Sequence, residues 1–221
     1  MQRTQQDSNR ETIALHLLLG LFFGLTLASC AGNKTYVLQL RPYPAGEHAP
    51  KSAATVGLLP FVDDRPSPQV LGERVLSKDK REPILLESPS PSEDVTYILR
   101  RSLKARDIRV VELSSRWDLT AENLKTLPEE VTVAIAGRIE SLEIEAQSSM
   151  FKTLVRYRVR LSAHIGFKGE GRVVTNVVEV SPEETMLRFN PEEVATSLNE
   201  ALATALDQLV ETALSTSDSG P

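Results

Sequence analysis

Two adjacent carboxylates and an arginine, Asp63, Asp64 and Arg65, are the residues of this sequence best suited by type and spacing to chemistry. Paired carboxylates can share a proton in acid–base catalysis, and their oxygens are the ligands that hard cations prefer. No third oxygen ligand stands nearby, and the motif follows an apolar run, where aspartate commonly bonds to the backbone of a turn. We therefore interpret it as a turn at a strand end, and a carboxylate or metal site stays open as the alternative.

Histidine and serine chemistry have little support in the sequence. The histidines are His16, His48 and His164, and none stands at ligand spacing from a cysteine or a second histidine. No G-x-S-x-G elbow, P-loop or H-E-x-x-H motif occurs. The residues therefore predict a protein that is not an enzyme and uses no metal or other cofactor, although carboxylates assembled only by folding would leave no local signature.

The single cysteine, Cys30, lies at the end of a hydrophobic segment near the N-terminus. Residues 17–27 read LLLGLFFGLTL and are preceded by basic residues, which is the pattern of a secretory signal peptide. A membrane-spanning helix needs roughly 20 apolar residues, more than this run supplies. The pattern predicts a cleaved signal peptide over 1–29, a lipidated tether over 30–34, a single domain over 35–214 and a disordered tail over 215–221.

Residues 27–30, LASC, resemble the lipobox of bacterial lipoproteins. The resemblance implies cleavage before Cys30, a diacylglycerol on its thiol and a fatty acid such as palmitate on its new amine. Because each buried methylene contributes about 0.8 kcal/mol, three acyl chains would hold the protein firmly on a membrane. Ala31 in place of an aspartate implies sorting to the outer membrane with the body in the periplasm, and the periplasmic face of the inner membrane is the alternative.

The charge balance is mildly acidic, with 25 Lys and Arg against 30 Asp and Glu and a net charge of −5. Nucleic-acid binding depends on a surplus of basic residues that neutralise phosphates, so this balance argues against such a partner. With its one thiol acylated, the exported chain would form no disulfide and would depend on its hydrophobic core.

Apolar runs predict the strands of the first half. Residues 55–62, TVGLLPFV, are continuously apolar, which is typical of a strand buried on both faces. The stretch 69–87 is polar, and only its end suggests a strand. The other strands expected before the central region are 35–40, 83–86 and 108–113.

Two helices are expected to cover the sheet. SPSE at 90–93 predicts a capping box and a helix over 91–106. NPEE starts a longer helix over 191–214, whose wide apolar stripe needs a sheet to cover. A short helix is expected at 120–127. The solvated face of the first helix should carry its basic residues, with membrane contact as the alternative: Arg100, Arg101, Lys104 and Arg106.

The clearest β signal covers residues 131–180. Apolar residues alternate along 131–146 with a change of phase that predicts a bulge between 137 and 141. A second strand over 155–167 should pair with the first, and a third should follow at 172–180. The expected fold is therefore an α+β two-layer sandwich, in which a mostly antiparallel sheet with a meander at about 131–180 is covered by the two helices.

Three arginines, Arg156, Arg158 and Arg160, share the polar face of the second meander strand and form a candidate interaction site. They could face phosphate-bearing lipid. The alternative is a solvated sheet face, because the hairpin register places Glu145 opposite Arg156 and Glu143 opposite Arg158.

The body resembles the pattern of YajG-type envelope lipoproteins, in the segments VGLLPFVDDRP, LGERV, SPSEDVTYILRRSLKARDIRVV and RYRVRLSAHIGFKGEG followed by NPEEVATSLNEALATALDQLV. The resemblance implies a non-enzymatic periplasmic lipoprotein. We expect an accessory or assembly component of an envelope or transport system, held on the membrane through Cys30 and contacting an envelope protein by its sheet face or an edge strand. A lipid-handling or carrier module of the envelope is the alternative.

Overall fold

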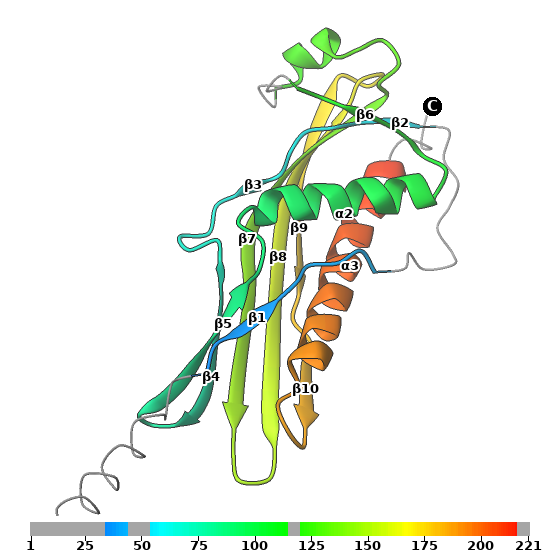
Figure 1. Cartoon of the computed structure of the whole chain (residues 1–221). Helices are drawn as coiled ribbons and strands as arrows, with labels where there is room; N and C mark the ends of the chain where they lie inside the picture. Colours follow the sequence, from blue (N-terminus) through cyan, green and yellow to red (C-terminus); the bar gives the residue numbers. More distant parts are fainter. Residues whose placement is uncertain (1–33, 44–53, 115–119, 216–221) are drawn as a thin grey trace, which may run out of the picture. The chain divides into compact units, whose positions relative to one another are not determined.

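The computed structural model describes residues 34–43, 54–114 and 120–215 (Figure 1). The chain from Thr35 onward groups into one compact unit. The predicted signal peptide, Cys30, His48 and nearly all of the predicted tail lie outside the described residues.

Ten strands, two α-helices and one 3-10 helix make up the described part of the chain. The α-helices are α2 (Pro91–Ala105) and α3 (Pro191–Ser215), and the 3-10 helix η2 spans Glu122–Thr126. The strands are β1 (Tyr36–Leu38), β2 (Thr55–Leu58), β3 (Val62–Asp63), β4 (Val70–Ser77), β5 (Lys80–Leu86), β6 (Arg109–Glu112), β7 (Val133–Ser148), β8 (Thr153–Phe167), β9 (Arg172–Val180) and β10 (Glu183–Met186).

A long antiparallel hairpin of β7 and β8 forms the centre of the sheet (Figure 1). The other edge of β7 pairs in succession with three short parallel strands, β2, β3 and β4. The other edge of β8 pairs antiparallel with β9 and β10. Strands β5 and β1 extend the sheet from β4, and β6 extends it from β2. The longest ladders are antiparallel, which confirms the predicted fold class.

The predicted bulge lies in β7, where the register with β8 shifts between Ile139 and Ser141. Glu145 stands opposite Arg156 and Glu143 opposite Arg158, as predicted. The bulge inserts one residue, so the apolar side chains before and after it face the same core.

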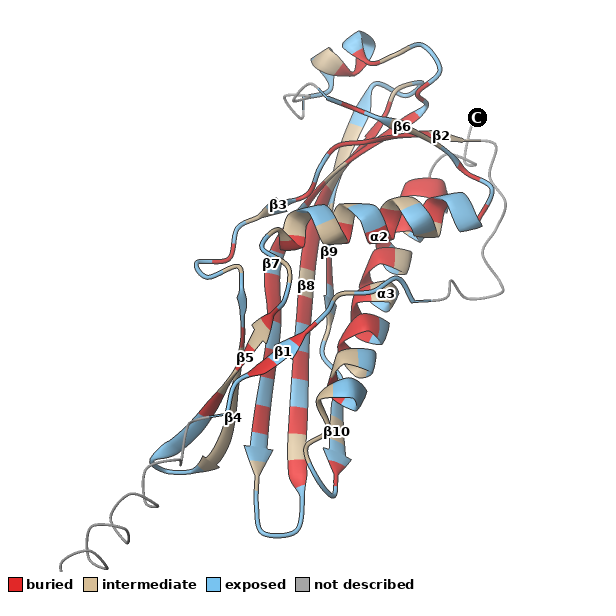
Figure 2. Ribbon diagram, in the orientation of Figure 1, coloured by how far each residue is buried: buried red, intermediate tan, exposed pale blue. Residues whose placement is uncertain are grey.

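The main core lies between the sheet and the two α-helices. Alternate residues of β7 and β8 are buried along their shared length, as the red and blue bands of Figure 2 show. α3 contributes an apolar stripe in which Leu198, Leu202 and Leu209 are fully buried. This arrangement confirms the two-layer sandwich.

A second, smaller core covers the opposite face of the sheet at the β2 end. It forms where η2 and its flanking loop pack over β7, and its residues are Leu59, Leu113, Leu124, Leu127, Val131 and Ala134. Because Val56 and Leu58 belong to the main core, the segment around β2 is buried on both sides, as its apolar run predicts. Beyond the bulge, the same face carries the three candidate arginines.

The two strands β4 and β10 are not evident in the sequence, because β10 is polar and the apolar residues of β4 fall in adjacent pairs and do not alternate. β10 forms since β9 pairs with β8 only from Val159 to Phe167, which leaves the start of β8 available to Glu183–Met186. β4 similarly fills the edge of β7 beyond β3. Long strands therefore pair through backbone hydrogen bonds with segments whose side chains show no strand pattern.

The helix starts agree with prediction, but only one is capped by a side chain. Asn190 Oδ1 accepts a hydrogen bond from the Glu192 amide at 3.1 Å. The side chain of Ser90 makes no capping bond, so the predicted capping box is wrong. Instead, the Ser90 carbonyl accepts from the amides of Glu93 and Asp94 at 3.0 and 3.2 Å.

Candidate functional site

The Asp63–Arg65 motif is a buried ion pair at the end of β3. Arg65 Nη2 lies 2.7 Å from Asp63 Oδ2, and both side chains are buried. The Arg65 guanidinium also donates to the carbonyls of Leu142 and Pro68 at 3.2 and 2.6 Å. Asp63 Oδ1 accepts from the amide of Arg65 at 3.1 Å, which closes the turn. These contacts support the turn interpretation over a catalytic carboxylate.

The remaining candidates for acid–base or metal chemistry lie apart from one another. Asp64 pairs with Arg138 at 2.8 Å on the surface. His164 Nδ1 lies 3.1 Å from the hydroxyl of Thr175 on the neighbouring strand. Within the residues that the structure describes, no group of three or more histidine, cysteine, aspartate or glutamate side chains could hold a metal ion.

The three candidate arginines stand in a row on the exposed face of β8, and each reaches a carboxylate. Arg156 Nε lies 3.3 Å from Glu183, and its guanidinium lies 4.0 Å from Glu145. Arg158 pairs with Glu179 at 2.9 Å, although Glu143 is opposite it in register. Arg160 bridges two carboxylates, Glu140 at 2.7 Å and Glu179 at 2.8 Å.

The electrostatics of this row favour a solvated face over a phosphate site. Hydrogen bonds from Ser162 and Arg160 hold the pKa of Glu140 below its usual range. Those from Arg160 and Arg158 lower the pKa of Glu179. Four glutamates against three arginines give this surface a formal excess of acidic groups, which offers an anionic headgroup no net attraction.

A buried tyrosine connects β8, β10 and α3. Tyr157 donates its hydroxyl to the Glu184 carboxylate, whose other oxygen accepts from the hydroxyl of Ser197 at 3.1 Å. Burial, and then the hydrogen bond to Glu184, raise the pKa of Tyr157 far above its usual value. The side chain is therefore a neutral donor at physiological pH and positions β10 against the helix.

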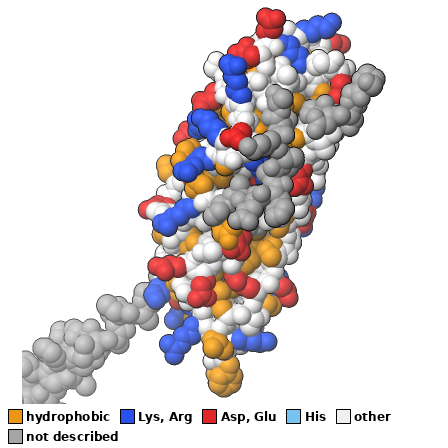
Figure 3. Space-filling view, turned by 90° about the vertical axis from the view of Figure 1, so that its right-hand side faces the viewer, with side chains coloured by type: hydrophobic (Ala, Val, Ile, Leu, Met, Phe, Trp, Pro, Cys, Tyr) orange, Lys and Arg blue, Asp and Glu red, His pale blue; other side chains and the backbone are white. Residues whose placement is uncertain are grey.

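The large apolar side chains with the highest exposed fractions were not among the predicted site residues. Met150 and Phe151, in the turn between β7 and β8, are 89 % and 78 % exposed, and Leu187, just after β10, is 86 % exposed. Figure 3 shows hydrophobic side chains projecting from one end of the protein with Lys and Arg beside them. The signal in the sequence was the presence of two large apolar residues in a predicted hairpin turn.

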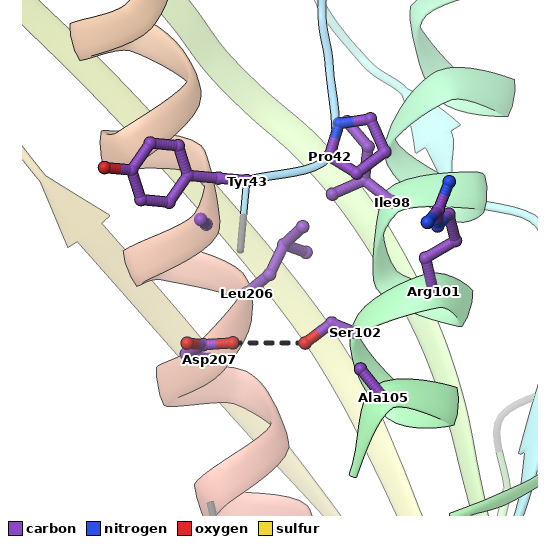
Figure 4. A pocket seen from close by; sticks show the side chains of 9 residues that line it. Pro42, Tyr43, Ile98, Arg101, Ser102, Ala105, Leu206 and Asp207 are labelled. Atoms are coloured by element: carbon purple, nitrogen blue, oxygen red, sulfur yellow. Dashed lines mark hydrogen bonds between the residues drawn. The ribbon is translucent and has the colours of Figure 1, made fainter. Parts of the chain in front are cut away.

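A cavity of about 260 Å³ lies between α2, α3 and the segment that follows β1 (Figure 4). The Ser102 hydroxyl donates to Asp207 across it at 3.2 Å. Ile98 and Leu206 form its apolar wall, and the Tyr43 hydroxyl donates outward to Glu200 at 2.7 Å. Its volume lies just below the roughly 300–1,000 Å³ of typical small-molecule sites.

Arg106, expected on the solvated face of α2, is buried, and that expectation is wrong. Its Nη2 lies 2.5 Å from Asp207 Oδ1 on α3. The helix ends one residue earlier, at Ala105, so helical periodicity no longer sets the direction of the Arg106 side chain.

A wider hollow of about 550 Å³ lies between β1 and the start of α3. Its buried wall is Asn199, whose amide donates to the carbonyls of Gln39 and Ala195 at 3.1 and 2.8 Å. The Asn199 carbonyl oxygen accepts from the amide of Arg41 at 2.9 Å. The side chain is thus engaged in holding the segment after β1 on the helix.

No family model and no curated protein matches the sequence. Among solved structures, protein XCC0632 from Xanthomonas campestris, described with the family DUF330, is similar over 84 % of this chain and 97 % of its own. The TM-score is 0.55 and the sequence identity 14 %. This similarity shows a shared fold.

Two further similar structures come from other bacteria. A putative neuraminyllactose-binding hemagglutinin homolog from Helicobacter pylori covers 83 % of this chain and 99 % of its own, with a TM-score of 0.41 and 13 % identity. Lipoprotein GNA1162 from Neisseria meningitidis covers 72 % and 99 %, with a TM-score of 0.37 and 8 % identity. Within the described residues, no helix combines the length and apolar character that a membrane crossing requires.

Proposed function

We propose that this chain is a bacterial lipoprotein of the cell envelope that acts as a non-enzymatic accessory or assembly component. The observation that carries the proposal is the sequence of residues 27–30, LASC, directly after the hydrophobic segment 17–27. Such a segment directs export, and acyl chains on Cys30 would fix the body to a membrane surface. We assign it to the periplasmic face of the outer membrane, following Ala31.

The arrangement of polar groups supports a role in binding. Asp63 and Asp64 each form an ion pair with an arginine, and the arginines of β8 form ion pairs with glutamates. These charges stabilise the turn and the sheet face on which they lie. The groups that looked most suited to chemistry therefore have structural partners, which favours a function exerted through surfaces.

The proposed partner is another envelope protein that contacts the sheet. Among the described strands, β6 pairs with β2 alone, so its second edge is available to a strand of a partner. An added strand would form backbone hydrogen bonds along that edge. The open face of β8 offers alternating charges that would set the orientation of such a partner.

The test is crosslinking in cells that express the full-length protein, followed by mass spectrometry of the crosslinked products and of the N-terminal peptide. Cys30→Ala removes the acylation site. Ser29→Ala is the matched control, because it keeps a small residue before the cysteine. We expect an acylated N-terminal Cys30, fractionation with membranes and one reproducible envelope-protein partner in the wild type and in Ser29→Ala.

Loss of both the membrane association and the crosslinked partner in Cys30→Ala would support the proposal. An N-terminal peptide that still contains residues 17–27 in the wild type would contradict the lipoprotein assignment. Acylated protein that crosslinks to no protein and retains only lipid would contradict the accessory role and favour the lipid-handling alternative.

A further inference from the structure

Three turns at one end of the sheet expose apolar and basic side chains together. The first is the β7–β8 turn, closed by a hydrogen bond of 2.7 Å from the Ser149 amide to the Lys152 carbonyl. Its two central residues, Met150 and Phe151, extend beyond the last paired residues of the hairpin and are almost fully exposed. Exposed apolar side chains of this size are unfavourable in water, because burying each of them would remove a large apolar area from solvent.

The second and third turns lie at the same end because of the strand registers. Met186 pairs with Thr153, so Leu187 and Arg188 follow β10 beside the β7–β8 turn. β4 runs parallel to β7 with Val75 opposite Gln147, which brings the β4–β5 turn to this end as well (Figure 1).

The charge of these turns is opposite to that of the whole chain. Within residues 78–80, 149–152 and 187–188 there are four cations and a single carboxylate, all exposed, whereas the chain has a net charge of −5. Figure 3 shows Lys and Arg side chains next to hydrophobic side chains at this end. The four cations of the three turns are Lys78, Lys80, Lys152 and Arg188.

This combination fits the interface of an anionic membrane better than a protein surface. Apolar side chains at a narrow tip can enter the acyl region while neighbouring Lys and Arg extend toward lipid phosphates. Each basic residue near an anionic leaflet contributes attraction to it.

The start of the described body faces the same end. β1 is parallel to β5 with Tyr36 opposite Ile84, so Thr35 lies about 10 Å along β5 from the level of Lys80. Cys30 stands five residues before Thr35, and an extended chain of that length covers at most about 17 Å. Acyl chains on Cys30 can therefore enter the leaflet that this tip would touch.

We propose that the Met150–Phe151 turn, with Leu187 beside it, inserts into the leaflet that holds the Cys30 acyl chains, while Lys152 and Arg188 contact its phosphates. The inference rests on the proposed lipoprotein function and deepens it. Insertion of this turn would orient the body. Strands β7 and β8 would stand steeply to the membrane, and the end of the sheet with β2 and β6 would point away from it.

The test uses the lipidated full chain with Phe151→Cys, labelled with an environment-sensitive fluorophore and reconstituted into vesicles of phosphatidylethanolamine and phosphatidylglycerol. Because Cys30 is acylated, the new thiol is the one that labels. Gly169→Cys is the matched control, since Gly169 is in the β8–β9 turn at the opposite end of β8 and a Cβ there meets nothing within 4 Å. If lipidation fails, Cys30 is labelled as well and each chain carries two labels. A failure of the lipoprotein assignment can therefore be distinguished from a failure of the turn to insert.

We expect the fluorophore at position 151 to shift to shorter wavelength and to be quenched by spin-labelled acyl chains, while position 169 shows neither effect. Adding Lys152→Glu and Arg188→Glu should weaken the quenching at 151. A singly labelled protein whose position 151 stays in water would overturn the proposal. Shielding of 151 in cells but not in these vesicles would also overturn it, and would indicate a protein partner at the tip.

Discussion

Arg106, at the end of α2, lies with its Nη2 atom 2.5 Å from Asp207 Oδ1 in the middle of α3. The arginine side chain is 3 % exposed and the aspartate side chain 29 %. Asp207 also accepts a hydrogen bond from Ser102 at 3.2 Å. The pair joins the two helices that cover the sheet.

Removing the carboxylate of this pair should destabilise the protein. Asp207→Ala leaves the Arg106 charge buried without its partner, and we expect the free energy of unfolding to fall by about 3 kcal/mol, the lower end for a broken buried pair. Glu211→Ala, one turn further along the exposed face of α3, should change it by less than about 0.5 kcal/mol. Urea denaturation measures both, and equal effects would show that the ion pair adds nothing.

Gly72 is expected to tolerate no side chain. Its φ is +149°, and a Cβ atom at this position would lie 1.9 Å from the carbonyl oxygen of Ile144 in β7. Gly72→Ala would push β4 away from β7 and should lower the stability by more than about 2 kcal/mol.

The matched substitution is Gly169→Ala, because a Cβ atom at Gly169 has no neighbour within 4 Å. It should change the stability by less than about 0.5 kcal/mol. Thermal unfolding followed by circular dichroism compares the two variants. A Gly72→Ala protein as stable as Gly169→Ala would mean that β4 does not approach β7 as described.

Acid should destabilise the protein partly through the carboxylates around Arg160. The pKa values of Glu140 and Glu179 are lower in the folded state than the usual 4.5, so the unfolded state binds protons more readily. Their stabilising contribution is complete above pH 4.5 and is lost as the pH falls through the folded-state values. Arg160→Gln should therefore flatten the loss of stability below pH 4.5.

Urea midpoints measured across that pH range test the prediction. Lys125→Gln is the control for charge, because it also removes one exposed cation but lies on η2, away from these glutamates. It should keep the wild-type pH dependence. The same acid slope in the wild type and in Arg160→Gln would contradict the role given to this ion-pair network.

At high pH, the ionisation of Tyr157 should lower the stability of the folded protein. The pKa of Tyr157 is raised in the folded state, chiefly by burial, whereas an unfolded tyrosine has its usual pKa of 10.0. The folded state keeps the proton that the unfolded state releases, so stability falls as the pH rises above 10.0. Tyr157→Phe should reduce this fall, although it costs about 1 kcal/mol at neutral pH through the lost hydrogen bond to Glu184.

Tyr97→Phe is the matched control for this alkaline effect, because Tyr97 lies on α2 and is 44 % exposed, whereas Tyr157 is buried. The fall in stability that Tyr157 causes above pH 10.0 should persist in this variant. Unfolding by urea at increasing pH measures both variants. An unchanged slope in Tyr157→Phe would show that Tyr157 ionises equally in both states.

The pattern of residue types was enough to predict the central hairpin, its bulge and the pairing of Glu145 with Arg156. It could do so because side chains alternate with a period of two, so the phase of the apolar residues sets both the buried face and the register. Apolar stripes with the helical period of about 3.6 residues predicted both α-helices. The turn at Asp63 was also predicted, because its bonds are made within two residues.

The positions of β4, β10 and the Arg106 side chain, and the neighbours of the Met150–Phe151 turn, could not be predicted from local patterns. The position of β10 depends on how much of the edge of β8 is left after β9 has paired. The burial of Arg106 depends on Asp207, a carboxylate 101 positions later. The sequence placed Met150 in a turn, but the registers of β4 and β10 brought two basic turns beside it. Which backbone edges and charges remain to be paired is settled once the core has formed, and no local pattern of residues contains that information.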